Sequence, residues 1–113
     1  GKIPSFYNVI PESNHNEING FEVPELARKF HAIFLKDHRD HPQVVKRMAI
    51  TEKIYKEKGV TTTALELSGA SIWDKIFSSL LLADWTAHYL ADEYGIDSES
   101  VPTVENLKKL LNT

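Results

Sequence analysis

Two short runs of strand-forming residues, joined by a helical pattern, constrain the fold of this chain more than any other feature. The first run is His31–Leu35, and the second, Val60–Leu67, is rich in β-branched residues. Both have the length and composition of strands. Between them, Pro42 can open a helix and Gly59 can end it. A strand–helix–strand unit places its strands in a parallel sheet with a right-handed crossover, so the sequence predicts an α/β fold.

Two more helices are expected after the second run. Ser71 can cap a long helix that begins at Ile72, continues to about Tyr94 and ends at Gly95. A last helix is predicted near Thr103–Leu111. The long helix carries apolar residues on more than one side, which is typical of a helix in a core or at a subunit interface.

The predicted sheet is too small to stand alone. At 113 residues the chain is one domain at most. Parallel sheets are normally covered on both faces and contain more than two strands. Either further strands lie within residues 1–30, or the chain is part of a larger fold, and we favour the second interpretation.

Charge and apolar content argue against two classes of partner. Thirteen basic and 16 acidic residues give a formal net charge of −3, and the basic residues are spread along the chain. Nucleic-acid binders normally carry a basic patch. No uninterrupted apolar run exceeds four residues, the length of Leu80–Ala83, which is too short to cross a bilayer. We therefore expect neither a nucleic-acid nor a membrane partner. The sequence contains no Asn-x-Ser/Thr glycosylation acceptor, which fits the expected cytoplasmic location. The absence of cysteine excludes disulfides.

The densest polar chemistry lies in the segment Pro11–Glu17. It places His15 between Asn14 and Asn16, with Glu17 directly after them, and it has neither helical nor strand periodicity. Loops that carry such groups are often functional sites. A histidine can donate and accept protons near neutral pH, so His15 is a candidate acid–base group. An exposed surface histidine is the alternative.

The residues around His15 resemble the "P-x-F…P-E-x-N-H-N-E" stretch of the bifunctional phosphoglucose/phosphomannose isomerases, a family of sugar isomerase (SIS) domain proteins. A second match resembles the family's "x-G-V-D-P-x-P-V-x-x-I-x-x-L-K" ending, although Asp97 is followed here by serine. The matching residues are Ile3–Phe6, Pro11–Glu17, Tyr94–Asp97, Val101, Val104, Leu107 and Lys108.

The resemblance implies a three-layer α/β/α fold with a parallel sheet. Residues 1–113 would be the C-terminal portion of the second SIS domain, which would lack its first strand or strands. Residues 1–28 would form an active-site loop segment, and residues 29–113 a βαβα core with a C-terminal helix.

The resemblance also implies a reaction. The complete enzyme would interconvert glucose 6-phosphate, or mannose 6-phosphate, with fructose 6-phosphate by ring opening and proton transfer through a cis-enediol. It would use no metal or organic cofactor, and would be a homodimer whose active sites are shared across subunits. His15 would move the proton at the ring oxygen, in the active site of a neighbouring subunit.

The resemblance assigns roles to four more residues. Lys108 would be a catalytic lysine near the ring oxygen, with a solvated helix lysine as the alternative. Asn14, Asn16 and Glu17 would orient the imidazole or bind substrate hydroxyls. Hydrogen bonding within the loop is an equally good explanation for these three.

The catalytic glutamate of the family is not in this sequence. It lies in a short "N-E-x-A/G-K" stretch, of which only Gly1 and Lys2 are present. The Ser/Thr-rich phosphate loop of SIS domains would also lie upstream. We therefore expect the chain alone to be inactive. The alternatives are a non-catalytic module that binds sugar phosphates and a dimerisation domain that uses the long helix.

His38 and His41, three residues apart in a polar loop, raise the question of a metal site. Two histidines at this spacing need more ligands in a helical or hairpin frame. The isomerase family has a similar "D-H-P-R" phrase between a strand and a helix. We therefore interpret the loop as a turn, with Asp40 or His41 as the helix cap, and expect no metal.

Overall fold

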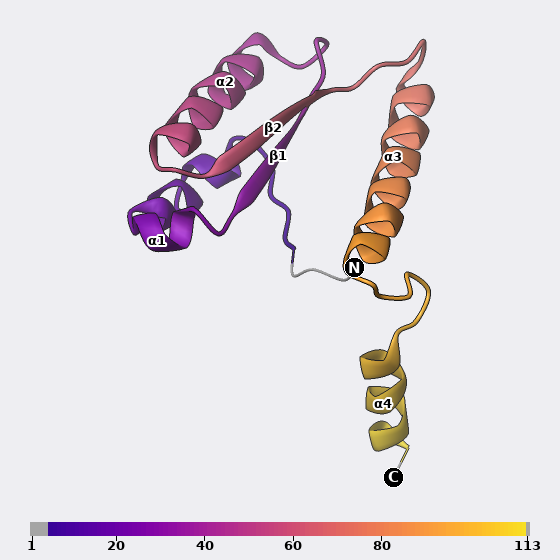
Figure 1. The fold of residues 1–113 in the computed structure, drawn as a ribbon. Helices are drawn as coiled ribbons and strands as arrows, with labels where there is room; N and C mark the ends of the chain where they lie inside the picture. Colours follow the sequence, from indigo (N-terminus) through magenta and orange to yellow (C-terminus); the bar gives the residue numbers. More distant parts are fainter. Residues whose placement is uncertain (1–4, 113) are drawn as a thin grey trace. The chain divides into compact units, whose positions relative to one another are not determined.

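The computed structural model describes residues 5–112 and divides into two compact units. One unit comprises Phe6–Ser78 and holds the sheet, and the other comprises Ser79–Thr113 with Gly1–Ser5. The elements follow one another in the order η1 (Glu12–Asn14), η2 (Glu17–Phe21), α1 (Pro24–Ala27), β1 (His31–Lys36), α2 (Pro42–Glu57), β2 (Thr61–Glu66), α3 (Ile72–Glu93) and α4 (Pro102–Leu111) (Figure 1). The second isomerase motif lies wholly within this range, whereas Lys2, and Ile3 and Pro4 of the first motif, lie outside the described residues.

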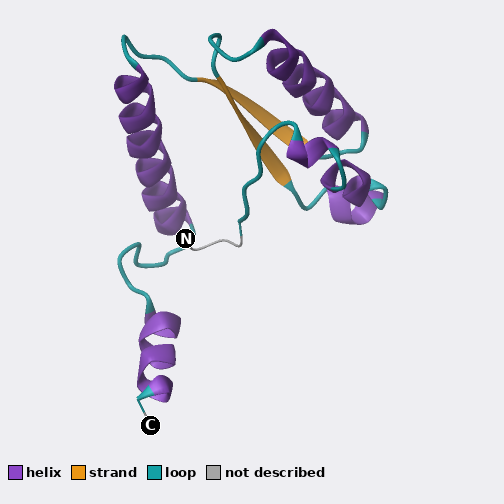
Figure 2. Ribbon diagram, turned by 180° about the vertical axis from the view of Figure 1, so that it is seen from behind, coloured by secondary structure: helices purple, strands orange, loops and turns teal. Residues whose placement is uncertain are grey.

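The sheet consists of β1 and β2, which pair in parallel. Its register runs from His31 opposite Thr61 to Lys36 opposite Glu66. Helix α2 connects the two strands and lies along one side of them, as Figures 1 and 2 show from opposite directions. The predicted strand–helix–strand unit is therefore confirmed.

The ends of α2 follow from local signals in the sequence. At its start, His41 Nδ1 accepts a hydrogen bond of 3.2 Å from the Gln43 N–H. At its end, Gly59 takes a φ of 89°, a left-handed conformation that glycine adopts without a steric penalty. The Val60 N–H then donates to the Tyr55 carbonyl at 2.9 Å, which closes the last turn. The predicted cap and stop are both confirmed.

The core of the larger unit lies between α2, β1 and the short helices that precede them. Its buried residues are Phe21, Ala27, Phe34, Tyr55 and Val60. The Tyr55 ring meets the rings of Phe21 and Phe34 edge-on, with centroid separations of 4.7 Å and 5.7 Å. Residues 12–27, expected as part of a loop segment, thus form short helices that pack on α2.

One face of the sheet is open in this chain. Side chains alternate between the two faces of a strand, so Ile33 and Leu35 lie opposite the buried Phe34. Their side chains are 61% and 48% exposed. The expectation of a buried strand therefore holds for the α2 side only. The first turns of α3 also expose Trp73 and Phe77.

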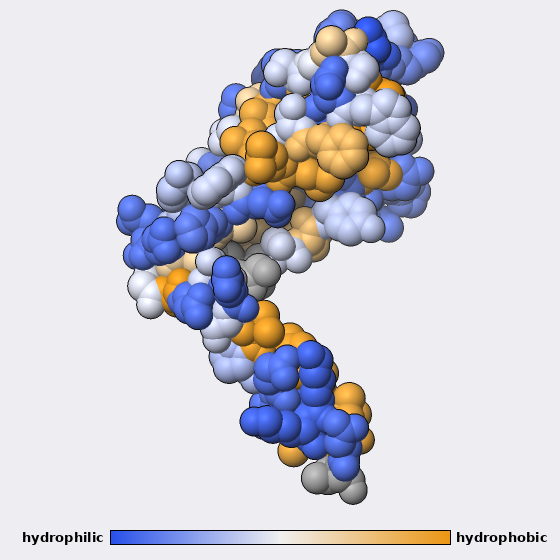
Figure 3. All heavy atoms as spheres, turned by 90° about the vertical axis from the view of Figure 1, so that its right-hand side faces the viewer, coloured by the Kyte–Doolittle hydropathy of each residue, from blue (hydrophilic) through white to orange (hydrophobic). Residues whose placement is uncertain are grey.

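The C-terminal unit contains the second part of α3, and α4. Gly95 ends α3 with a φ of 62°, and the Ile96 N–H donates to the Ala91 carbonyl at 2.9 Å, as predicted for a glycine stop. Helix α4 begins at Pro102, one residue before the predicted start. Figure 3 shows hydrophilic and hydrophobic residues on different sides of α4. Within residues 5–112, no helix is long and apolar enough to cross a membrane.

Candidate functional site

His15 lies at the end of the one-turn helix η1. The His15 N–H donates to the Glu12 carbonyl at 3.0 Å, and the Asn14 N–H donates to the Pro11 carbonyl at 2.9 Å. Ser13, inside this turn, is buried, whereas His15 is exposed. The backbone of the turn is therefore ordered by its own hydrogen bonds, and it presents the imidazole to solvent.

A side-chain hydrogen bond joins this turn to α2. Asn14 Nδ2 donates to Thr51 Oγ1 at 2.6 Å, and Thr51 Oγ1 donates to the Arg47 carbonyl at 2.8 Å. Thr51 is only 2% exposed. The residue next to His15 is thus held against the middle of α2 by a buried hydroxyl group.

Two adjoining hollows lie on this surface. The first, of about 340 Å³, is lined by Pro11, Glu12, Asn14, His15 and Arg47. The second, of about 320 Å³, shares two of these residues and is lined by Asn14, Ile18, Gln43, Lys46, Arg47, Ile50, Thr51 and Ile54. His15 therefore borders a hollow that combines a guanidinium, a carboxylate and an amide.

Two of the basic residues at these hollows have no acidic partner among the residues that the structure describes. Within residues 5–112, neither Lys46 nor Arg47 forms an ion pair with a carboxylate. By contrast, Lys58 at the end of α2 pairs with Glu22 at 2.7 Å. An unpaired guanidinium is available to an anionic ligand, because it offers planar donors that match phosphate and carboxylate oxygens.

Sequence reasoning did not find Arg47 or Thr51. They lie one turn apart on α2, so the helical pattern could place them on one face. Nothing in that pattern indicated that the His15 turn would pack there, because the contact joins residues 37 positions apart.

The other residues predicted from the His15 segment lie outside the two hollows. The carboxylate of Glu17 accepts a hydrogen bond from the Asn8 side chain. Asn16 is exposed, and its carbonyl accepts the Asn19 N–H at 3.1 Å. The structure therefore brings together Asn14 and His15, and gives Glu17 a partner within the loop.

Lys108 lies on α4, in the C-terminal unit. Its ammonium donates to Glu105 Oε1 at 2.8 Å, one turn earlier on the same helix, and both side chains are more than half exposed. This pair is an exposed surface ion pair, of a kind that contributes little to stability.

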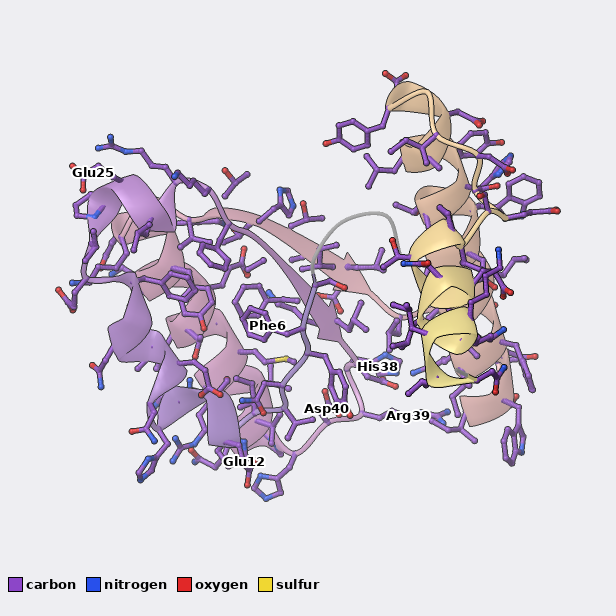
Figure 4. The ribbon with its side chains drawn as sticks, turned by 90° about the horizontal axis from the view of Figure 1, so that it is seen from below. Phe6, Glu12, Glu25, His38, Arg39 and Asp40 are labelled. Atoms are coloured by element: carbon purple, nitrogen blue, oxygen red, sulfur yellow. The ribbon has the colours of Figure 1, made fainter. Side chains whose placement is uncertain are left out.

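The loop between β1 and α2 is a turn with a helix cap, as predicted. Figure 4 labels His38, Arg39 and Asp40 on this turn, and Glu12 on η1. Asp37 Oδ1 accepts the Arg39 N–H at 2.9 Å, while His41 caps α2. Within the part of the chain that the structure describes, no three histidine or carboxylate side chains are grouped to hold a metal ion.

Asp37 also forms a largely buried ion pair with α3. Lys75 Nζ lies 2.5 Å from Asp37 Oδ1, and the two side chains are 2% and 13% exposed. The hydrogen bond from Lys75, with that from the Arg39 N–H, lowers the pKa of the Asp37 carboxyl below its ordinary value of 3.8. The pair fixes the first turn of α3 beside the end of β1.

Comparison with known proteins gives a consistent result. Residues 1–111 match the family model of the bacterial phospho-glucose isomerase C-terminal SIS domain. The chain is 37% identical over 110 residues to the bifunctional phosphoglucose/phosphomannose isomerase of Aquifex aeolicus, an alignment that covers 97% of this chain and 34% of the relative. It is 35% identical over 113 residues to the enzyme of the same name from Caldicellulosiruptor bescii, with 97% and 33% covered.

A third relative, from Thermoplasma volcanium, has the same name and is 30% identical over 108 residues, with 96% and 34% covered. The chain thus spans about a third of the length of these relatives. No solved structure matches it at a significant level.

The resemblance seen in the motifs around His15 and before Lys108 is confirmed by these matches. The predicted α/β class and parallel sheet are confirmed by β1, β2 and the helix that joins them. This chain belongs to the family of bacterial phospho-glucose isomerase C-terminal SIS domains.

Proposed function

We propose that this chain forms the C-terminal third of an isomerase that interconverts glucose 6-phosphate, or mannose 6-phosphate, with fructose 6-phosphate. The family match over residues 1–111 and the names of the relatives support this substrate class. The observation that carries the proposal is the position of His15, which is exposed and shares a hollow with the unpaired Arg47.

His15 would act in the opening of the sugar ring. In the cyclic aldose phosphates, as the bond between C1 and the ring oxygen breaks, the imidazolium of His15 donates a proton to that oxygen, and the C1 hydroxyl gives its proton to a solvent water molecule. The product is the open-chain aldehyde. Histidine suits this step because its ordinary pKa lies near neutrality, so both protonation states are accessible.

The later proton transfer between C2 and C1 needs a base that this sequence does not supply. By family resemblance, that base is a glutamate upstream of these residues, and the intermediate is a cis-enediol. We propose that Lys108 approaches the ring oxygen, and that Asn16 and Glu17 orient the imidazole or bind substrate hydroxyls. The amide nitrogen of Asn14 already donates to Thr51, which leaves its carbonyl oxygen to accept from substrate.

The open surfaces of the chain support its assignment to a longer protein. A parallel sheet is normally covered on both faces, yet Ile33 and Leu35 are exposed here. Trp73, Phe77 and Trp85 of α3 are at least half exposed as well. We propose that these surfaces pack against the remaining two thirds of the enzyme or against a second subunit. The proposed homodimer and metal-free chemistry rest on the resemblance, and the cytoplasmic location stays a prediction from the sequence.

The isolated 113-residue chain should not isomerise sugar phosphates, because the proposed base and phosphate loop are outside it. The measurement is the conversion of fructose 6-phosphate, followed by coupled oxidation of the glucose 6-phosphate formed. The control is the full-length protein under the same conditions, which should convert both aldose phosphates. Turnover by the isolated chain well above background would contradict the division of the active site. Inactivity of the full-length protein would contradict the proposed function.

Dimerisation without catalysis is the second candidate function, and the exposed apolar side chains of α3 favour it. Light scattering on the isolated chain measures dimerisation, and the fructose 6-phosphate assay on the full-length protein measures catalysis, so the two measurements together distinguish the two candidate functions. A dimeric chain together with an inactive full-length protein would support the dimerisation module.

Replacing Arg47 with glutamine in the full-length enzyme should raise the KM for fructose 6-phosphate about tenfold and change kcat little. Arg47 is free to contact the phosphate, and a hydrogen bond to a charged group is among the stronger ones. In a hexose 6-phosphate, the phosphate-bearing C6 is bonded to C5, which carries the ring oxygen. Because His15 is proposed to lie at the ring oxygen, a cation beside His15 lies on the phosphate side of the sugar.

Arg39→Gln is the matched control, because Arg39 is an exposed arginine in the β1–α2 turn and lines neither hollow. It removes the same charge and should leave KM unchanged. Inorganic phosphate should inhibit the Arg47 variant about tenfold more weakly than the parent enzyme. Equal KM values in the two variants would remove Arg47 from the binding site.

A further inference from the structure

Thr51 is a buried polar residue whose hydroxyl forms hydrogen bonds with two of the residues that line the hollow beside His15. It accepts a hydrogen bond from Asn14, the neighbour of His15, and it donates to the carbonyl of Arg47. The bond from the Thr51 hydroxyl, at 2.8 Å, has the usual length of an O–H···O hydrogen bond, and the bond from the Asn14 amide, at 2.6 Å, is short. The hydroxyl therefore both donates and accepts a hydrogen bond, as expected for a polar group in a residue that is 2% exposed.

One side-chain hydrogen bond joins residues 11–17 to α2 in the part of the chain that the structure describes. It is the bond between Asn14 and Thr51. The bonds within η1 set the shape of its turn but do not fix its place on the helix. The Asn14–Thr51 bond thus acts with the packing of Phe21 on Tyr55 to place His15 beside Arg47.

We propose that Thr51 is a positioning residue, which holds His15 at the place from which it can protonate the ring oxygen of the substrate. The effect of Thr51 on turnover rests on the proposed function of His15 as the proton donor. A proton donor must lie within hydrogen-bond reach of its acceptor, and a displacement of about 1 Å can cost about 100-fold in rate. Thr51 lines the second hollow but is only 2% exposed, so it would act through Asn14 rather than as a contact to substrate.

Thr51→Val in the full-length enzyme tests the proposal, because valine keeps the shape of threonine and removes the hydroxyl. We expect kcat for fructose 6-phosphate to fall roughly 10- to 100-fold, with KM within about threefold of the parent value. Thr51→Ser, which restores the hydroxyl, should recover kcat to within about threefold.

Thr62→Val is the matched control. Within the described residues, Thr62 Oγ1 is buried without a hydrogen-bond partner, so the same substitution there removes no hydrogen bond. Its kcat should equal that of the parent enzyme. A Thr51→Val enzyme as active as the Thr62→Val enzyme would overturn the proposal. So would a loss of activity in Thr51→Val that serine does not restore.

Amide hydrogen exchange provides a readout that does not depend on catalysis. Without the Thr51 hydroxyl, the amides of Asn14 and His15 should exchange at least several-fold faster, because the turn that holds them is no longer fixed to α2. Unchanged exchange at both amides would overturn the positioning role. An active His15→Ala enzyme would instead refute the proposed function, and the exchange result would still decide whether Thr51 holds the turn.

Discussion

Replacing His15 with alanine in the full-length enzyme should lower the turnover of fructose 6-phosphate roughly 10²- to 10⁴-fold, the range typical of a lost general acid–base group. Stability should change little, because the side chain is exposed at the end of η1 and buries little area. The measurements are kcat at saturating substrate and the thermal midpoint of the same preparation. A large loss of kcat without a loss of stability separates a chemical role from a structural one.

His38→Ala is the control for this prediction. Its side chain is 75% exposed on the β1–α2 turn, and its ring lies 3.6 Å from Asp37 Oδ1, so it is also a loop histidine near a carboxylate. It lines neither hollow, and its removal should leave kcat within about twofold. If the His15 variant retained the same activity as the His38 variant, His15 would be an ordinary surface histidine.

The second large effect is on stability. Lys75→Met should lower the melting temperature by an amount on the order of 10 °C, because it leaves the Asp37 carboxylate largely buried without its main partner. Methionine retains most of the apolar stem of lysine, so the change isolates the charge. The measurement is thermal unfolding at neutral pH.

Two comparisons make this prediction specific. Lys53→Met removes an exposed partner of Glu57, at 3.8 Å on α2, and should change the melting temperature by about 1 °C or less. Combining Lys75→Met with Asp37→Leu should recover much of the lost stability, since no uncompensated charge is then left. A Lys75→Met protein as stable as Lys53→Met would show that the pair is not a structural link.

The contribution of Asp37 should depend on pH in a defined direction. Its pKa is lowered in the folded state, so the stabilisation is present above the unfolded value and is lost as the pH falls through the folded value. The difference in melting temperature between the parent and Lys75→Met should therefore be complete at neutral pH and decrease below about pH 4.

The sequence predicted those parts of the fold that depend on local signals. Gly59 and Gly95 end their helices in left-handed conformations, and Ser71 Oγ accepts the Asp74 N–H at 3.1 Å as the expected cap of α3. Such signals act within one turn of a helix, so they can be read without knowing the rest of the chain. The strands were predictable from their composition, because one is a compact apolar run and the other is rich in β-branched residues.

The parts that could not be predicted depend on contacts between distant segments. The short helices of residues 12–27 have no hydrophobic period, and they are stabilised by packing on α2. Lys75 gives no sign in the sequence that it is buried, because its partner lies 38 residues away. Likewise, the motif identified His15, but it could not reveal that Thr51 and Arg47 would lie beside it.

The open face of the sheet bears on how this sequence can change over generations. Phe34 packs on Tyr55, so a substitution at Phe34 can be compensated within this chain. Ile33 and Leu35, on either side of it, point the other way and are exposed. If the rest of a longer enzyme covers that face, these two positions must vary in concert with residues elsewhere. Adjacent residues of one strand would then belong to two independent sets of co-evolving positions.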